Sequence, residues 1–262
     1  MKANTVILSS CRKPLSFASR VCTVALFSLL ASQAQATSYD AVADFSRLTN
    51  TDASTWSYRY QTGTLRDGIY PLLPTFTDAA GTWSPTNPGA WTLAGTIPEI
   101  GVNQTGSDAT FVPGPGSGPF TWPNHTMSVH PGPGPADLVV LSFLSPSTSF
   151  FDINFSFSSL DPNGGNGIAW FVDLNATDLS WGSYPDAGGS GMMTLNNIFV
   201  NAGDRINFIV DPNGDYFFDS TKVTATINSV AGVPDSASSL ALLSISLVTM
   251  FAARFLLRAR LA

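Results

Sequence analysis

Hydrophobic and polar residues alternate with a period of two through the middle of this chain. In residues 150–160, FFDINFSFSSL, the apolar side chains of Phe151, Ile153, Phe155 and Phe157 point one way and the intervening polar ones point the other. Strict alternation is typical of an antiparallel strand with one buried and one solvated face. The segment therefore predicts a half-buried strand.

The same pattern recurs in other parts of the body. Residues 206–210 and 222–227 alternate in the same way, while 137–144 and 167–174 are more continuously apolar, as expected of central strands. We find no convincing amphipathic helix between residues 37 and 233. The sequence predicts an all-β domain, an antiparallel β-sandwich that is jelly-roll-like.

Turn residues punctuate the predicted strands. Asp161–Gly164 and Asp211–Gly214 are both Asp-Pro-Asn-Gly, a composition that suits tight turns, and we expect both to be hairpin loops. Residues 111–135 are so rich in Pro and Gly that regular pairing is excluded over most of their length. This stretch is interpreted as a long irregular loop, either functional or a stiff surface cover.

The amino-terminal segment has the order of features found in a secretory signal peptide. Its front half carries four basic residues, an apolar run VCTVALFSLLA follows, and Ala34-Gln35-Ala36 forms a small-residue exit. We expect export through the Sec machinery and cleavage after Ala36, which defines residues 1–36 as the signal peptide. Both cysteines, Cys11 and Cys22, fall in that segment, so the exported protein would contain no thiol.

The charge of the chain is distributed unevenly. Four of the 12 Lys and Arg residues lie in the leader and three lie in the tail, which leaves five against all 18 acids, a formal charge of −13 between the two ends. Such a surface repels phosphate backbones, so nucleic acid is not an expected partner. Seventeen of the acids are Asp, which favours turns and supports the all-β prediction.

No arrangement of residues typical of a known catalytic centre occurs. The chain lacks a Gly-x-Ser-x-Gly elbow, a phosphate loop and a His-Glu-x-x-His segment. His125 and His130 are the only histidines, and five residues along a strand place side chains on opposite faces, which argues against a shared metal. We therefore predict that the protein is not an enzyme and has no cofactor.

Calcium is the one metal that the sequence brings into question. The oxygen-bearing side chains of Asp211, Asn213, Asp215 and Asp219 fall at positions one, three, five and nine of a loop, and calcium prefers oxygen ligands. The loop lacks the Gly of an EF-hand at position six, where Tyr216 stands. The favoured alternative is a turn whose polar side chains bond their own backbone.

Aromatic residues in polar surroundings suggest a binding surface. Trp122 lies in the long Pro-Gly segment, and Trp181 and Tyr184 lie in LSWGSYPDAGGSG. Exposed rings stack against sugar faces, and polar neighbours bond the hydroxyls. These three residues are the candidate ligand-binding residues, although for any one of them packing in the core is the favoured alternative.

The carboxyl terminus is a predicted membrane helix. Leu240–Leu257 is an apolar stretch of about 27 Å at 1.5 Å per residue, just long enough to cross a bilayer. It contains Arg254 near its inner end and is followed by Arg258 and Arg260, a basic cluster that belongs on the cytoplasmic side. The body would therefore remain outside the membrane.

Val233, Pro234 and Asp235 stand just ahead of that helix. A short motif, a membrane helix and an Arg cluster in this order resemble the PEP-CTERM class of bacterial sorting signals, in its Val-Pro-Asp variant. The resemblance covers residues 233–262 and implies that an exosortase recognises the motif and removes the tail. The protein would be anchored transiently in the inner membrane and then reach the cell surface or extracellular matrix.

The body, residues 37–232, has elements similar to β-sandwich cargo domains of such exported proteins, including Trp56-Ser-Tyr58-Arg-Tyr60 and Gly203-Asp-Arg-Ile-Asn-Phe. Those domains are similar to carbohydrate-binding modules in architecture. The leading hypothesis is a non-catalytic surface or matrix protein that contacts exopolysaccharide through a loop face. The alternatives are a structural or adhesive coat component that binds proteins and, third, a secreted glycan hydrolase.

Overall fold

A computed structural model describes residues 36–63, 66–77, 88–93, 96–111, 120–134, 137–161, 164–185, 187–230 and Arg254. The predicted signal peptide up to residue 35, and the sorting motif and tail helix apart from Arg254, lie outside the described residues. Within the described part of the chain we find no helix with the length and apolar character needed to cross a bilayer. The compact body comprises Ala36–Ala231.

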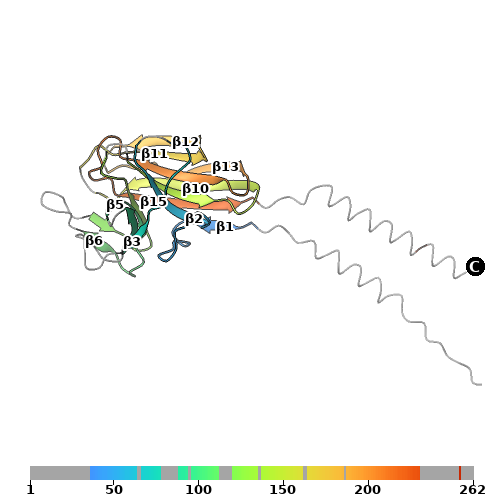
Figure 1. Ribbon diagram of the computed structural model, residues 1–262, viewed down its shortest axis with the longest axis horizontal. Helices are drawn as coiled ribbons and strands as arrows, with labels where there is room; N and C mark the ends of the chain where they lie inside the picture. Colours follow the sequence, from blue (N-terminus) through green and yellow to red (C-terminus); the bar gives the residue numbers. More distant parts are fainter. Residues whose placement is uncertain are drawn as a thin grey trace, which may run out of the picture. The chain divides into compact units, whose positions relative to one another are not determined.

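One sheet of the body has five antiparallel strands in the order β12-β11-β14-β9-β2. Its strands β11 and β12 lie next to one another at the top of Figure 1. Its strands are β2 (Trp56–Gln61), β9 (Leu138–Leu144), β11 (Ile168–Leu174), β12 (Thr177–Tyr184) and β14 (Arg205–Asp211). The continuously apolar segments 137–144 and 167–174 were expected to form central strands, and β9 and β11 do have neighbours on both edges.

The second sheet has eight antiparallel strands, seven of them in the order β13-β10-β15-β8-β5-β4-β3, with β1 also paired to β15. Its strands are β1 (Ser38–Asp40), β3 (Thr75–Thr77), β4 (Ala90–Leu93), β5 (Thr96–Val102), β8 (Met127–His130), β10 (Ser149–Ser159), β13 (Met193–Val200) and β15 (Thr221–Ser229). A separate two-stranded sheet joins β6 (Ala109–Phe111) to β7 (Phe120–Trp122).

The two larger sheets form a sandwich because their inner faces share one hydrophobic core. Phe151, Ile153, Phe155 and Phe157 on β10 are all fully buried, as the alternation predicted. Phe157 stacks on Trp170 of the opposite sheet with ring centroids 5.2 Å apart. The all-β antiparallel sandwich is thus confirmed, whereas jelly-roll connectivity stays a prediction.

Two turn predictions need correction. Asp161–Gly164 follows β10 of the eight-stranded sheet and precedes β11 of the five-stranded sheet, and Asp211–Gly214 connects β14 back to β15. Both segments therefore cross between sheets and are not hairpin loops. Asp-Pro-Asn-Gly specifies a local reversal but not the partner of the next strand, which is decided by burial of the apolar face.

The Pro- and Gly-rich stretch 111–135 contains short strands between its irregular parts. It contains β7 and β8, and β8 pairs with both β5 and β15. Residues 112–119 and 135 of this stretch lie outside the described residues. Pro123, Pro131 and Pro133 fall outside the strands, so regular pairing is confined to short segments of the described part of this stretch.

A segment after β2 folds back over the outer face of the five-stranded sheet. Tyr60 donates its backbone N–H to the carbonyl of Pro71, and Leu73 donates to the carbonyl of Tyr58. Tyr70 then forms a small second core with Leu138, Val140 and Ile209, with Phe171 packed against it. This outer face is consequently buried in part, unlike the solvated outer face of a simple sandwich.

Candidate functional site

A row of polar residues crosses the outer face of the five-stranded sheet, one from each strand. The strand register places them side by side as Ser57, Ser142, Asn207, Asp173 and Asp178. All except Asp178 are completely buried. Buried polar groups require hydrogen-bond partners, and the Ser142 hydroxyl donates to Asn207 Oδ1 at 2.7 Å. We call these five residues the polar row.

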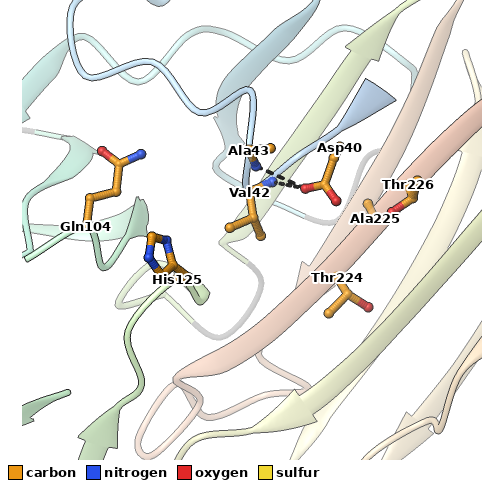
Figure 2. A pocket seen from close by; sticks show the side chains of 8 residues that line it. All are labelled: Asp40, Val42, Ala43, Gln104, His125, Thr224, Ala225 and Thr226. Atoms are coloured by element: carbon orange, nitrogen blue, oxygen red, sulfur yellow. Dashed lines mark hydrogen bonds between the residues drawn. The ribbon is translucent and has the colours of Figure 1, made fainter. Parts of the chain in front are cut away.

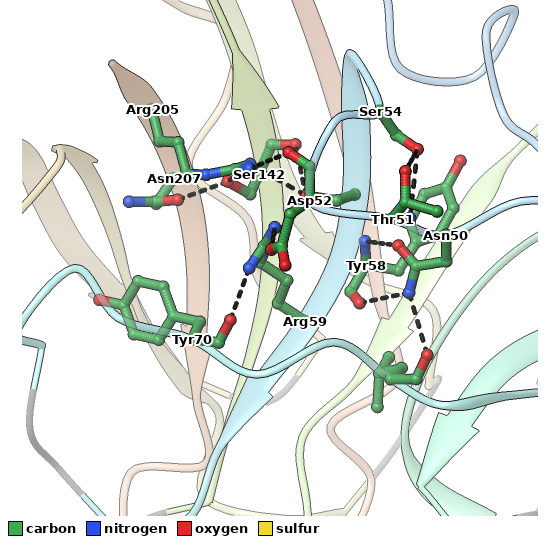
Figure 3. Close-up of polar contacts among 12 residues, drawn as sticks. Asn50, Thr51, Asp52, Ser54, Tyr58, Arg59, Tyr70, Ser142, Arg205 and Asn207 are labelled. Carbon is green, nitrogen blue, oxygen red and sulfur yellow. Dashed lines mark hydrogen bonds and ion pairs between the residues drawn. The ribbon is translucent and has the colours of Figure 1, made fainter. Parts of the chain in front are cut away.

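Arg59 of β2 anchors one end of the polar row. Its Nε donates to Ser57 Oγ at 2.7 Å, its Nη1 to the Tyr70 carbonyl at 2.7 Å, and its Nη2 to Asp52 Oδ1 at 2.6 Å (Figure 3). The guanidinium offers five donors in a rigid plane, so one side chain ties together a strand, the covering segment and a preceding turn. The Arg59 hydrogen bond and charge hold the pKa of Asp52 below its usual range.

Arg205 of β14 approaches the same place from the neighbouring strands. Its Nη1 donates to Ser57 Oγ at 3.2 Å and to Ser142 Oγ at 3.3 Å. Burial and then the nearby charge of Arg59 lower the pKa of Arg205. Two cations therefore lie close together in a body whose overall charge is strongly negative, with Asp52 as their shared anionic partner.

Arg66 closes the other end of the polar row. Its Nη1 lies 3.0 Å from Asp173 Oδ1 and 2.7 Å from Asp178 Oδ1, and its guanidinium carbon lies 3.8 Å from the centre of the Phe171 ring. Burial raises the pKa of Asp173 to about 6, an effect that Arg66 partly opposes. Hydrogen bonding to Arg66 lowers the pKa of Asp178. The two carboxyl groups together hold the guanidinium in place.

Trp181 lies directly beside this ion group. It is paired with Phe171 across β11 and β12, so both rings belong to the same face of the sheet as the paired Asp173 and Asp178. The Trp181 side chain is 70% exposed, on an edge strand. We call Trp181, Phe171, Arg66, Asp173 and Asp178 the Trp181 face. It presents an open indole next to a fixed cation and an exposed carboxylate.

The structure removes Trp122 and Tyr184 from the predicted ligand-binding set. Trp122 is 3% exposed and donates its indole N–H to the Thr126 carbonyl at 2.7 Å. Tyr184 is 6% exposed, with its hydroxyl 3.2 Å from Thr221 Oγ1. The two residues were expected to present ring faces to a ligand, but they satisfy their polar ends internally and pack. Of the three predicted rings only Trp181 is available.

The four residues considered for calcium serve mainly as turn residues. Asp211 Oδ1 accepts from the N–H of Asn213 at 2.8 Å, and Asp215 Oδ1 accepts from the N–H of Phe217 at 3.2 Å. Asp219 is 2% exposed. Among the described residues, no group of three or more His, Cys, Asp or Glu side chains is arranged to hold a metal ion. This geometry matches the favoured alternative, a turn bonded to its own side chains.

The sequence analysis missed the three arginines. Arg59, Arg66 and Arg205 are three of only five basic residues between the two ends, and all three meet the polar row. The available signal was Ser57, Ser142 and Asn207, each polar and each set between apolar neighbours on the outward side of a predicted strand. Outward polar residues were interpreted as solvated, which is the usual case for a sandwich.

No family model and no curated protein matches this chain. Among solved structures, CBM51 from Clostridium perfringens GH95, in complex with methyl-galactose, is 14% identical with a TM-score of 0.33, covering 50% of this chain and 89% of that one. A family 35 carbohydrate binding module from Clostridium thermocellum is 10% identical with a TM-score of 0.26, covering 47% and 89%. The CBM36-1 domain of a xylanase from the hindgut metagenome of Trinervitermes trinervoides is 14% identical with a TM-score of 0.27, covering 41% and 79%. The likeness is one of sandwich-like antiparallel sheets, and no ligand or site is transferred from it.

Proposed function

We propose that the body is a non-catalytic polysaccharide-binding domain that uses the Trp181 face. The observation that carries this proposal is that Trp181 of the edge strand β12 is 70% exposed. Its cross-strand partner on β11, Phe171, is partly buried. A sugar that stacks on the Trp181 ring would remove apolar surface of both partners from water, which favours binding. The proposal does not depend on the solved structures described above.

The chemistry around Trp181 suits a sugar. An indole face stacks against the C–H face of a pyranose ring, and neighbouring polar groups bond its hydroxyls. The Asp178 side chain is 52% exposed and can accept hydroxyl hydrogen bonds. The Arg66 side chain is 23% exposed and is fixed by its two carboxylate partners, so it can donate without losing much conformational freedom.

The paired carboxylates favour binding over hydrolysis. Glycoside hydrolysis requires two carboxyl groups that reach opposite sides of the bond to be broken. Asp173 is completely buried and both of its oxygens lie within 3.1 Å of Arg66 Nη1. Its role in this proposal is to position Arg66, and the exposed Asp178 contacts the ligand.

A glycan array probed with residues 37–232 tests the proposal. We expect signal on at least one polysaccharide, and Trp181→Ala should weaken it by about fivefold or more, since stacking on an aromatic ring contributes about 1–3 kcal/mol. Phe217→Ala is the matched control, because Phe217 is also exposed, at 54%, but lies on the β14–β15 connection. Absence of signal on every glycan, or equal loss in both variants, would count against the Trp181 face.

Delivery is proposed from the two ends of the chain. The protein is exported through a signal peptide of residues 1–36, held briefly in the inner membrane by its tail, and released to the cell surface or matrix after an exosortase recognises Val233, Pro234 and Asp235. The support is the sequence resemblance alone. Replacing Arg254, Arg258 and Arg260 by Glu should abolish correct retention, as judged by cell fractionation, and mass spectrometry of surface material should find no peptide ending at Ala262.

A structural or adhesive coat role is the second candidate. Phe150 and Phe199 form an exposed pair on the eight-stranded sheet, each 50% exposed and with ring centroids 5.3 Å apart. An exposed apolar pair can contribute to a protein contact. If Phe150→Ser with Phe199→Ser disrupts surface assembly while Trp181→Ala does not, this second function is preferred.

A further inference from the structure

The eight-stranded sheet contains an interrupted edge. On one side of β15, residues 221–223 pair with β8 and residues 226–228 pair with β1. The two short strands thus follow one another along the same edge of β15, with a break in strand pairing opposite Thr224 and Ala225. Just after β1, Ala41 still donates its backbone N–H to the Ala225 carbonyl at 3.0 Å. Residues 41–44 after β1 and His125 before β8 lie in turns.

A hollow of about 590 Å³ opens at the break (Figure 2). Its lining residues come from β1 and the following turn, from β15, and from the loops next to β5 and β8: Asp40, Val42, Ala43, Gln104, His125, Thr224, Ala225 and Thr226. Figure 2 shows Gln104 and His125 on one side and Asp40 with Thr226 on the other. The volume falls in the range of small-molecule sites.

Several polar groups in this hollow are left available by the fold. Gln104 and His125 are exposed, and neither side chain has a hydrogen bond within the described residues. His125 also has a φ of 54°, a left-handed conformation that is uncommon outside glycine and is often retained at functional positions. By contrast, Asp40 Oδ1 already accepts from the N–H groups of Val42 and Ala43, at 2.8 and 3.0 Å, so the wall of the hollow is internally bonded.

The lining indicates the class of ligand. Of the two lining hydroxyls, that of Thr224 is already bonded to Ser156 Oγ at 2.6 Å. A carboxylate, an amide, an imidazole and the Thr226 hydroxyl offer both donors and acceptors, while Val42 adds apolar surface. This mixture matches a sugar ring, which carries hydroxyls at its edge and C–H groups on its faces. A metal ion fits poorly, because Asp40 and His125 are the only ionisable groups that line the hollow.

The hollow and the Trp181 face lie on opposite sides of the sandwich. Thr224 and Thr226 alternate with the inward Val223, Ala225 and Ile227, so they face outward from the eight-stranded sheet. The Trp181 face belongs to the outer side of the five-stranded sheet. We propose that the hollow is a second saccharide site and that the body cross-links polysaccharide strands by binding one on each side. This inference rests on the proposed function for its ligand class.

Saturation-transfer NMR on the full chain tests the second site. The chain is held in a detergent without a sugar head group, and the probes are glucose, galactose, mannose and N-acetylglucosamine. Gln104→Ala combined with His125→Asn removes the available polar groups, and Asn tolerates the left-handed backbone. Ala43→Tyr fills the hollow from an exposed position. We expect about tenfold weaker binding at this site in both variants, because roughly two hydrogen bonds or the space itself is lost.

The pattern across variants separates the two sites. We expect Trp181→Ala and the hollow variants each to remove one part of the binding, and the wild type alone to cross-link a soluble polysaccharide of the bound sugar, seen as a rise in light scattering. If Trp181→Ala abolishes all binding, or if Ala43→Tyr changes nothing, the second site is overturned. If no monosaccharide binds, it is also overturned, whereas the glycan array still tests the Trp181 face. If only the hollow variants lose binding, the Trp181 face fails and the hollow stands.

Discussion

Each outer face of the sandwich contains a shielded carboxyl group, and the two differ in their partners. Asp173 of the five-stranded sheet is bonded by Arg66, whereas Glu99 of the eight-stranded sheet has His130 as its cross-strand neighbour and no ion pair among the described residues. Burial raises the pKa of Asp173 to about 6 and that of Glu99 to about 7. Shielding from water raises both pKa values. At Asp173 the positive charge of Arg66 opposes this rise by stabilising the ionised carboxylate, whereas among the described residues no cation opposes the rise at Glu99, which comes from burial alone.

The covers of the two faces also differ. Residues 66–73 and the arginines Arg59 and Arg205 seal the five-stranded sheet with hydrogen bonds, while Trp122 of β7 packs onto Gly101 of the eight-stranded sheet. The cover of the five-stranded sheet is held by directional polar hydrogen bonds. The cover of the eight-stranded sheet is the Trp122 ring, which packs over a glycine. We therefore expect the stability of the polar cover to depend on its charged groups and the stability of the Trp122 cover to depend on side-chain volume.

The largest effect is expected at Arg59. Arg59→Met leaves the Tyr70 carbonyl without its donor inside the protein and takes away one of the two arginine donors to the Ser57 hydroxyl, with Arg205 remaining as the other. The cost is about 3 kcal/mol in the free energy of unfolding. Urea denaturation of the two proteins measures the difference. Lys222→Met is the matched control on the other sheet, where a change within about 0.5 kcal/mol is expected. Equal effects at both positions would show that the polar cover does not stabilise the fold.

The next effect concerns the volume-sensitive cover. A Cβ atom on Gly101 would lie 2.5 Å from the Gly89 carbonyl oxygen and 2.8 Å from the Trp122 ring. Gly101→Ala should therefore destabilise the body by about 2 kcal/mol, measured by thermal unfolding. Adding Trp122→Leu should recover part of the loss, because only the ring clash is relieved. A fully additive double variant would contradict this packing.

Glu99 provides a pH test of the unpaired acid. Because its pKa is raised in the folded state, folding takes up a proton between the ordinary pKa of Glu and about 7, and this contribution to stability is lost as pH rises through 7. Glu99→Gln should gain on the order of 2 kcal/mol relative to wild type at pH 8 and almost nothing at pH 4. Melting curves at several pH values measure this. A gain that does not change with pH would indicate packing instead of charge.

The smallest effect is expected at Asp178. Its carboxylate is half exposed and shares Arg66 with the buried Asp173. Asp178→Asn should change the free energy of unfolding by no more than about 0.5 kcal/mol, since solvent screens exposed pairs. The same variant should still weaken glycan binding severalfold on the array, which separates its binding role from a structural one. A large loss of stability would mean that Asp173 alone cannot hold Arg66.

The sequence analysis identified β9, β10, β11, β14 and β15 correctly because their apolar faces are regular, and it did not name the other strands. Phe151 through Phe157 and Val223 through Ile227 are buried as expected. The prediction of hairpin loops was wrong at the two Asp-Pro-Asn-Gly segments, because the sheet that the next strand joins is decided by tertiary packing. The sequence analysis also could not distinguish Trp181 from Trp122, because both stand among small and polar residues. Only the fold shows that Gly101 makes room for one of these rings, while an edge strand exposes the other.

The pairing of the first strand with the last has a mechanical consequence. Ser38–Asp40 pairs with β15, and Ser229 donates its backbone N–H to the Thr37 carbonyl at 2.8 Å. On its other edge β15 pairs with β10 over nine residue positions, Phe151–Ser159. Tension applied through residue 230 along the strand would load these bonds in parallel, in shear, and not one after another. A body tethered by that end would resist being pulled apart by flow.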